Sequence, residues 1–129
     1  MTQTITTLFV YGTLRPGDVR WHFLAPFAAD EGVDDAVDGH LFDTGCGYPA
    51  ALFGPDGEGV VRTIHGRRYE LHAHLLAEAL RVLDEEESSV AGLYRRVLVT
   101  TRAGRTAWAY EYGSGLELTP IDGGDWLTR

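Results

Sequence analysis

The 129-residue sequence predicts a single α+β domain that spans residues 1–129. Several short apolar runs are separated by turns rich in glycine, proline and aspartate, which is typical of strands. One long segment, which begins near Ala73, has the spacing of an amphipathic helix. Because the strands do not alternate regularly with helices, we expect an α+β fold and not a doubly wound parallel sheet.

The first predicted element is a short buried strand over residues 8–11, whose sequence is Leu-Phe-Val-Tyr. A continuous run of apolar and aromatic residues is typical of a strand inside the protein. Gly12, Thr13 and Leu14 follow it and lead into the turn Arg-Pro-Gly. Free backbone N–H groups at such a strand end can hold an anion, because glycine lets a ligand come close. An ordinary strand and turn is the simpler alternative.

Short elements fill the middle of the chain. Residues 18–24 have a rough helical spacing, and residues 37–42 alternate as in a strand. Residues 50–53 and 60–61 flank a loop rich in glycine, so we expect them to form a β-hairpin. A further strand is expected from residue 64 to residue 71.

A strongly amphipathic helix follows, since Leu76, Leu80 and Leu83 recur at positions i, i+4 and i+7 of one helix face. The clearest hairpin in the chain comes next. Its two alternating runs cover residues 94–101 and 106–112 and are joined by a short loop that contains glycine.

The predicted helix ends in the acidic run Asp84-Glu85-Glu86-Glu87, which faces the negative end of the helix dipole. Glu87 lies four residues after Leu83 and therefore falls within the apolar stripe. Glu86 lies in the same stripe, on the side that carries Ala79 and Val82. Asp84 and Glu85 point toward solvent. Burial and neighbouring like charges would raise the pKa of an inward carboxylate toward the range of a general acid or base. A solvated acidic helix end is the alternative interpretation.

The amino-acid composition limits the classes of binding partner and the cellular compartment that we expect for the protein. A net charge of −8 and a pI near 4.9 argue against nucleic acid and anionic membranes as partners. Cys46 is the single cysteine, so no internal disulfide is expected and a reducing compartment is indicated. The sequence has no stretch typical of a signal peptide or of a transmembrane helix. We therefore predict a cytoplasmic protein.

The sequence also contains a series of short motifs: Phe9-Val10-Tyr11-Gly12-Thr13-Leu14-Arg15-Pro16-Gly17, the Tyr48-Pro49 loop, Ile64-His65-Gly66 with Tyr69-Glu70-Leu71, Leu83-Asp84-x-x-Glu87, Tyr94-Arg95-Arg96, and Gly124-Asp125-Trp126. In their order and spacing, these motifs resemble those of the gamma-glutamylcyclotransferase-like superfamily, and most of all those of the branch of small proteins that includes gamma-glutamylamine cyclotransferase. The similarity covers nearly the whole chain and implies a small mixed β-barrel with flanking helices.

The resemblance implies an enzyme that acts on a small molecule, a gamma-glutamyl amine or peptide, and needs no metal or cofactor. The α-amine of the substrate would attack its own γ-carbonyl, which yields 5-oxoproline and a free amine. Glu87 matches the family's catalytic carboxylate, although the run of three glutamates also allows Glu86 to take this role. A non-catalytic binding or regulatory protein with the same cavity is the competing hypothesis.

The resemblance also implies which residues would bind the substrate. The backbone N–H groups of Gly12, Thr13 and Leu14 would hold either the α-carboxylate or the oxyanion. Tyr11 and Tyr94 would line the cavity and form hydrogen bonds through their hydroxyl groups.

Overall fold

The computed structural model describes residues 4–12 and 20–129, which form a seven-stranded sheet and two α-helices. Short 3-10 turns lie at Ala25–Phe27, Ala73–Leu75 and Trp126–Thr128. In chain order the main elements are β1 (Thr7–Val10), α1 (Trp21–Leu24), β2 (Val33–Asp43), β3 (Pro49–Phe53), β4 (Thr63–Glu70), α2 (Leu76–Ser89), β5 (Arg95–Thr100), β6 (Thr106–Glu111) and β7 (Thr119–Pro120).

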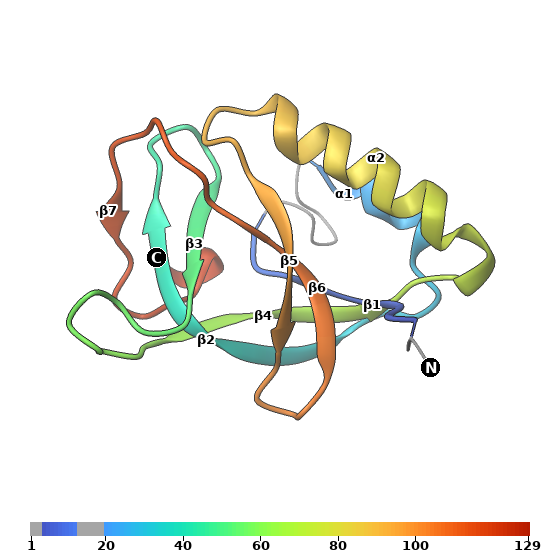
Figure 1. The fold of residues 1–129 in the computed structure, drawn as a ribbon, viewed down its shortest axis with the longest axis horizontal. Coiled ribbons are helices and arrows are strands. Elements are labelled where there is room, and N and C mark those ends of the chain that lie inside the picture. The colour runs from blue at the N-terminus through green and yellow to red at the C-terminus, as the bar shows by residue number, and fades with distance from the viewer. Residues whose placement is uncertain (1–3, 13–19) are drawn as a thin grey trace.

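The strands lie in the order β3-β2-β4-β1-β6-β5, and β7 pairs with β2. Strand β1 pairs in parallel with β6, whereas the other pairs are antiparallel. The sheet curls so far that β3 meets the end of β6, where the Tyr112 N–H donates to the Ala51 carbonyl oxygen at 2.9 Å. The mixed sheet is therefore nearly closed into a barrel with helices on one side, which confirms the expected α+β barrel (Figure 1).

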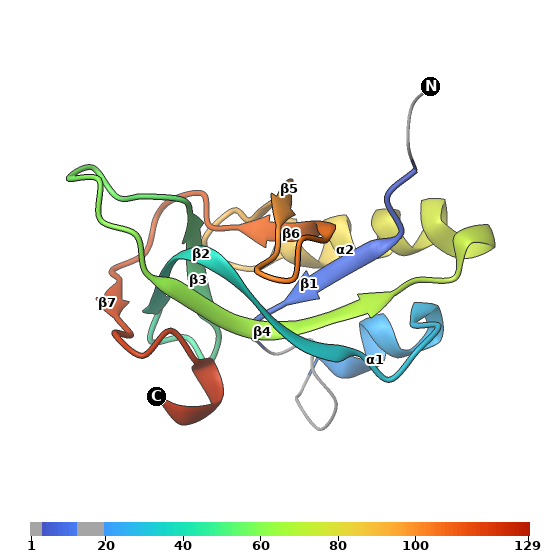
Figure 2. The same cartoon turned by 90° about the horizontal axis from the view of Figure 1, so that it is seen from below.

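Strand β2 bends along its length and thereby pairs with two different strands, β4 and β3 (Figure 2). Its first half, Val33–Asp38, pairs with β4, and its second half, Gly39–Asp43, pairs with β3. A Cβ on Gly39 would lie 2.7 Å from the carbonyl oxygen of Leu52, so the close approach at the bend requires glycine.

The first half of β2 is longer than the sequence predicts, since only residues 37–42 were expected to form a strand. Asp34 and Asp35 interrupt the apolar alternation, but both pair with arginines on the neighbouring strand β4. Arg67 Nη1 donates to Asp34 Oδ1 at 3.1 Å, and Arg68 Nε donates to Asp35 Oδ2 at 2.9 Å. Opposite charges across two strands thus stabilise a segment that hydrophobicity alone does not reveal.

The predicted hairpin between residues 50–53 and 60–61 is wrong. Strand β3 pairs with β2 instead, and the two valines of the second segment are about half exposed in the loop before β4. Asp56 closes this loop, because its side chain accepts from the Val60 N–H and its own N–H donates to the Val60 carbonyl, both at 2.9 Å. A loop held by its own aspartate needs no ladder with β3.

Strand β1 is buried on both faces, in agreement with its continuous apolar run. Leu8 and Val10 belong to a hydrophobic cluster shared with residues of both helices. Phe9 and Tyr11 belong to a second cluster, which contains residues of the other barrel strands. The end of β1 is therefore tied to two cores at once.

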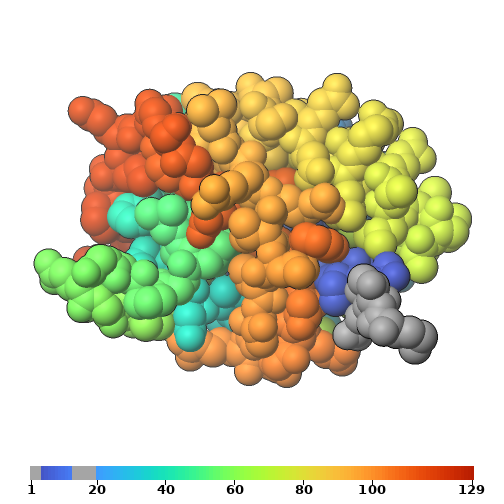
Figure 3. Space-filling view, viewed as in Figure 1, coloured from blue at the N-terminus to red at the C-terminus, as the bar shows by residue number. Residues whose placement is uncertain are grey.

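Both predicted helices are present in the described part of the chain and lie side by side (Figure 1). Helix α1 begins at Trp21, and the start of the predicted helix, residues 18–19, lies outside the described residues. Helix α2 extends through the acidic run, as expected. The predicted hairpin of residues 94–101 and 106–112 forms β5 and β6, and in the space-filling view this hairpin and α2 make up much of one face (Figure 3).

We expect Leu83→Ala to lower the free energy of unfolding by about 2–5 kcal/mol, because Leu83 is fully buried between α2 and the sheet. Urea unfolding followed by circular dichroism measures this change. Leu98→Ala is the matched control, since Leu98 is 52% exposed on β5 and its truncation should cost no more than about 0.5 kcal/mol. Equal losses for the two variants would contradict the assigned packing of α2.

Candidate active site

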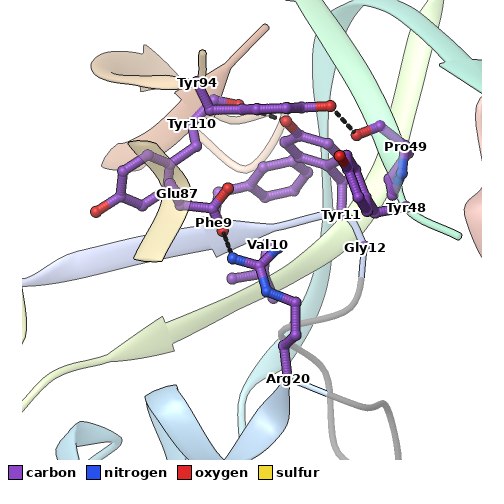
Figure 4. A pocket seen from close by; sticks show the side chains of 10 residues that line it. All are labelled: Phe9, Val10, Tyr11, Gly12, Arg20, Tyr48, Pro49, Glu87, Tyr94 and Tyr110. Atoms are coloured by element: carbon purple, nitrogen blue, oxygen red, sulfur yellow. Dashed lines mark hydrogen bonds and ion pairs between the residues drawn. The ribbon is translucent and has the colours of Figure 1, made fainter. Parts of the chain in front are cut away.

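A pocket lies where the end of β1 meets the last turn of α2, the start of β3 and residues around β5 and β6 (Figure 4). Its cavity volume is only about 30 Å³, and one side of it is open to solvent. Its walls are mainly aromatic, and two oppositely charged side chains meet within it. The lining residues are Phe9, Val10, Tyr11, Gly12, Arg20, Tyr48, Pro49, Glu87, Tyr94 and Tyr110.

The predicted site residues are distant in sequence, and the fold brings the described ones together. Tyr11 and Gly12 follow β1, Glu87 projects from α2, and Tyr94 precedes β5, yet all four line this pocket. The other two predicted residues, Thr13 and Leu14, lie outside the described residues.

Glu87 is carried into the pocket by the apolar face of α2. It follows the buried Leu83 by one helical turn, and its side chain is only 8% exposed. Glu86 lies at the edge, with a side chain that is 23% exposed, and it does not line the pocket. Of the two glutamates that the sequence left open, Glu87 is therefore the one that a ligand in the pocket would meet.

Arg20 is the charged pocket residue that sequence reasoning missed. Its Nη2 donates to Glu87 Oε1 at 2.9 Å, and its Nε lies 3.3 Å from Glu86 Oε1. The arginine side chain is 13% exposed, so water screens this ion pair less than it screens a surface pair. The sequence shows only an arginine a few residues after the glycine-containing loop, which is too common a pattern to indicate a site.

The electrostatics of the pocket favour a carboxyl group that can exchange a proton. Burial raises the pKa of Glu87 above its ordinary value, and the negative charge of Glu86 raises it further. The charge and the hydrogen bond of Arg20 act in the opposite direction, but burial has the larger effect. The pKa thus shifts toward neutrality, which is the direction that general acid–base catalysis requires.

The two predicted tyrosines present acceptor oxygens and not free donors to the pocket. The Tyr11 hydroxyl donates to the Tyr110 carbonyl oxygen, and the Tyr94 hydroxyl donates to the Pro49 carbonyl oxygen at 2.6 Å. Burial, and after it the charge of Glu87, raises the pKa of both tyrosines, so both keep their protons. Since each proton is already donated to the backbone, a bound ligand meets hydroxyl oxygens that accept.

Gly12 and Pro49 fix the mouth of the pocket through direct contact. A Cβ on Gly12 would lie 2.7 Å from Pro49 Cγ, so a larger residue would displace the proline. The Pro49 carbonyl oxygen also accepts the hydrogen bond from the Tyr94 hydroxyl. The glycine of the first motif is thus required by its close approach to the proline of the second.

Asp84 forms hydrogen bonds behind the pocket, whereas we expected it to point simply toward solvent. The Tyr110 hydroxyl donates to Asp84 Oδ1 at 2.7 Å, and Arg96 Nε lies 3.3 Å from the same oxygen. The Asp84 side chain is still 43% exposed. Its role is to hold the Tyr110 ring, which forms part of the pocket wall. Glu85 is exposed, as expected.

Trp126 stabilises the fold and does not line the pocket. It is buried in the cluster of the barrel strands, and Asp125 accepts from the Leu127 N–H to begin the last 3-10 turn. Within residues 4–12 and 20–129, no group of three or more His, Cys, Asp or Glu side chains could hold a metal ion. No helix in this part of the chain is long and apolar enough to cross a membrane.

Comparison with known proteins assigns the chain to a family. The model of the family "Gamma-glutamyl cyclotransferase, AIG2-like" matches residues 8–128, so the protein belongs to this family. A protein of Halalkalibacterium halodurans, named "Putative gamma-glutamylcyclotransferase", is 37% identical over 93 residues, which make up 70% of this chain and 80% of that protein.

Solved structures share the fold. An uncharacterised protein of Pyrococcus horikoshii aligns with a TM-score of 0.65 at 23% identity, over 95% of this chain and 90% of its own. An AIG2-like protein of Mus musculus aligns with a TM-score of 0.56 at 19% identity, over 93% of this chain and 88% of its own. At these identities the likeness shows the fold alone.

We expect the Glu87 carboxyl to titrate above the ordinary glutamate value of about 4.3, because burial outweighs the charge of Arg20. Carbon-13 NMR of the side-chain carboxyls against pH measures this value. Arg20→Gln should raise the Glu87 pKa further, since it removes the opposing positive charge. Arg81→Gln, which removes a charge from the exposed face of α2, is the control. A Glu87 midpoint at or below 4.3 would refute the role given to burial.

Proposed function

We propose that the protein is a gamma-glutamyl cyclotransferase that converts a gamma-glutamyl amine or peptide into 5-oxoproline and a free amine. The observation that supports this most is the buried carboxyl of Glu87, with its raised pKa, in a pocket at the end of β1. Membership of the cyclotransferase family agrees with this function at the level of reaction class. A cytoplasmic location remains a prediction from the sequence.

The reaction requires a substrate held in a bent conformation and a group that transfers protons. When the pocket holds the gamma-glutamyl chain in a bent form, its α-nitrogen lies close to its own γ-carbonyl carbon, and attack within one molecule is strongly favoured. The aromatic walls, including Tyr11 and Tyr94, would limit the space to such a bent form. Their hydroxyl oxygens would accept hydrogen bonds from the α-ammonium group.

Glu87 would move protons between the two nitrogens of the substrate. It first accepts a proton from the α-ammonium, and the freed amine attacks the γ-carbonyl to form the lactam C–N bond. The tetrahedral oxyanion would be held by backbone N–H groups of Gly12, Thr13 and Leu14. The bond to the leaving nitrogen then breaks as Glu87 donates a proton to it. Two protons leave the α-nitrogen and the leaving nitrogen gains two, so the carboxylate is regenerated.

We expect Glu87→Gln to lower the rate of 5-oxoproline release by at least about 10²-fold, because the amide cannot transfer the proton. The wild-type protein is first incubated with a panel of gamma-glutamyl amines and dipeptides, and 5-oxoproline is measured by mass spectrometry. The best substrate is then used for the variants. Glu86→Gln is the matched control, since Glu86 does not line the pocket, and it should keep most of the activity.

Two outcomes would count against this proposal. Loss of activity in Glu86→Gln, with activity retained in Glu87→Gln, would assign the proton transfer to the other glutamate. No 5-oxoproline across the panel, together with saturable binding of its members, would favour a non-catalytic binding protein.

A further inference from the structure

We propose that Arg20 is the residue that binds the α-carboxylate of the substrate, and that its ion pair with Glu87 opens to admit the α-amino acid head group. The inference rests on the proposed function, since it assigns a substrate group within the same pocket. Neither the sequence motifs nor the family match assigns a role to Arg20.

The ion pair marks the place of the head group. Arg20 Nη2 and Glu87 Oε1 lie 2.9 Å apart, and both side chains are largely shielded from solvent. Figure 4 shows Arg20 reaching from the start of α1 to Glu87 across the pocket, with Tyr11 and Tyr94 beyond the carboxylate. Positive and negative groups in contact complement a ligand whose ammonium and carboxylate are attached to one carbon atom, as in a gamma-glutamyl compound.

The charges assign each end of the head group to one partner. Glu87, with the acceptor oxygens of Tyr11 and Tyr94, attracts the ammonium, which it must contact to accept its proton. Arg20 carries a planar guanidinium, whose N–H groups suit a carboxylate in a bidentate manner. Under this assignment the Gly12 N–H would serve the oxyanion and not the α-carboxylate, which are the two roles that the sequence left open.

The arginine side chain does not cap the neighbouring helix. Arg20 occupies the N-cap position of α1, yet its side chain makes no capping hydrogen bond. The Arg20 carbonyl, which any residue supplies, accepts from the Phe23 N–H at 3.1 Å. A substitution that keeps the backbone should therefore preserve α1 while it changes the pocket.

The same ion pair explains how the product would leave. Ring closure converts the ammonium into a lactam N–H, so 5-oxoproline keeps a carboxylate but loses the group that Glu87 attracts. The Glu87 carboxylate can then re-form its ion pair with Arg20, because it competes with the product carboxylate for the guanidinium. We therefore expect the product to bind more weakly than the substrate.

Paired substrates test this assignment. The first is the gamma-glutamyl amide of the best leaving amine of the panel, for example L-gamma-glutamyl-L-alanine. The second is the 4-aminobutyryl amide of the same amine, which lacks only the α-carboxylate. Cyclisation of either releases the same amine, so one assay measures kcat/KM for both. The proteins compared are the wild type, Arg20→Gln, Arg20→Lys and the control Arg81→Gln, which removes an exposed arginine of α2.

In the wild type, loss of the α-carboxylate should lower kcat/KM by about 10- to 100-fold, as expected for a hydrogen bond between charged groups. In Arg20→Gln the two substrates should differ by less than about 3-fold, because the carboxylate has lost its partner. Arg20→Lys should show an intermediate difference, and Arg81→Gln should behave like the wild type. A purely structural role of Arg20 would lower both rates alike and leave their ratio unchanged.

A ratio in Arg20→Gln equal to the wild-type ratio would overturn the assignment while the proposed reaction stands. If the wild type releases 5-oxoproline from no member of the panel, the proposed function fails, and binding still tests Arg20. NMR titration then compares 5-oxoproline with 2-pyrrolidinone, which lacks the carboxylate. Arg20 is supported if 5-oxoproline binds more tightly and Arg20→Gln removes that preference, and it is refuted if the preference persists.

Discussion

The burial of β1 on both faces is the constraint on which the site depends. Because Leu8 and Val10 pack toward the helices while Phe9 and Tyr11 pack within the barrel, the strand cannot shift without disturbing both cores. Its end, at Gly12, is therefore held in a fixed position relative to the last turn of α2. A nearly closed barrel and an amphipathic helix thus provide the two sides of a small pocket on rigid elements.

The pocket contains a charged side chain, Glu87, at a helix position where packing alone would favour an apolar residue. Glu87 occupies a position on the apolar face of α2, and its burial as an anion is unfavourable unless a counter-ion is present. Arg20 supplies that counter-ion, yet burial still keeps the pKa of Glu87 raised. Buried carboxyls with a raised pKa beside a charged partner are typical of catalytic sites, because such a shift favours proton transfer near neutral pH.

Much of this arrangement could be predicted from the sequence, and the exceptions have physical reasons. The buried run at β1, the helical period of α2 and its inward Glu87 are local patterns that the structure confirms. The start of β2 was missed because its acidic residues are balanced by arginines on another strand, and Arg20 was missed because its partners lie far along the chain. Such pairings between distant residues leave no periodic signal.

The central claim is that the pocket directs an intramolecular attack on the γ-carbonyl carbon. The most direct test is to measure whether oxygen from water is incorporated at that carbon. The wild-type protein is given its best gamma-glutamyl substrate in water enriched in oxygen-18, and the product is analysed by mass spectrometry. Cyclisation forms 5-oxoproline without incorporation of solvent oxygen, because the α-nitrogen and not water attacks the carbonyl. Glutamate that carries one oxygen-18 atom would show hydrolysis instead and would contradict the mechanism.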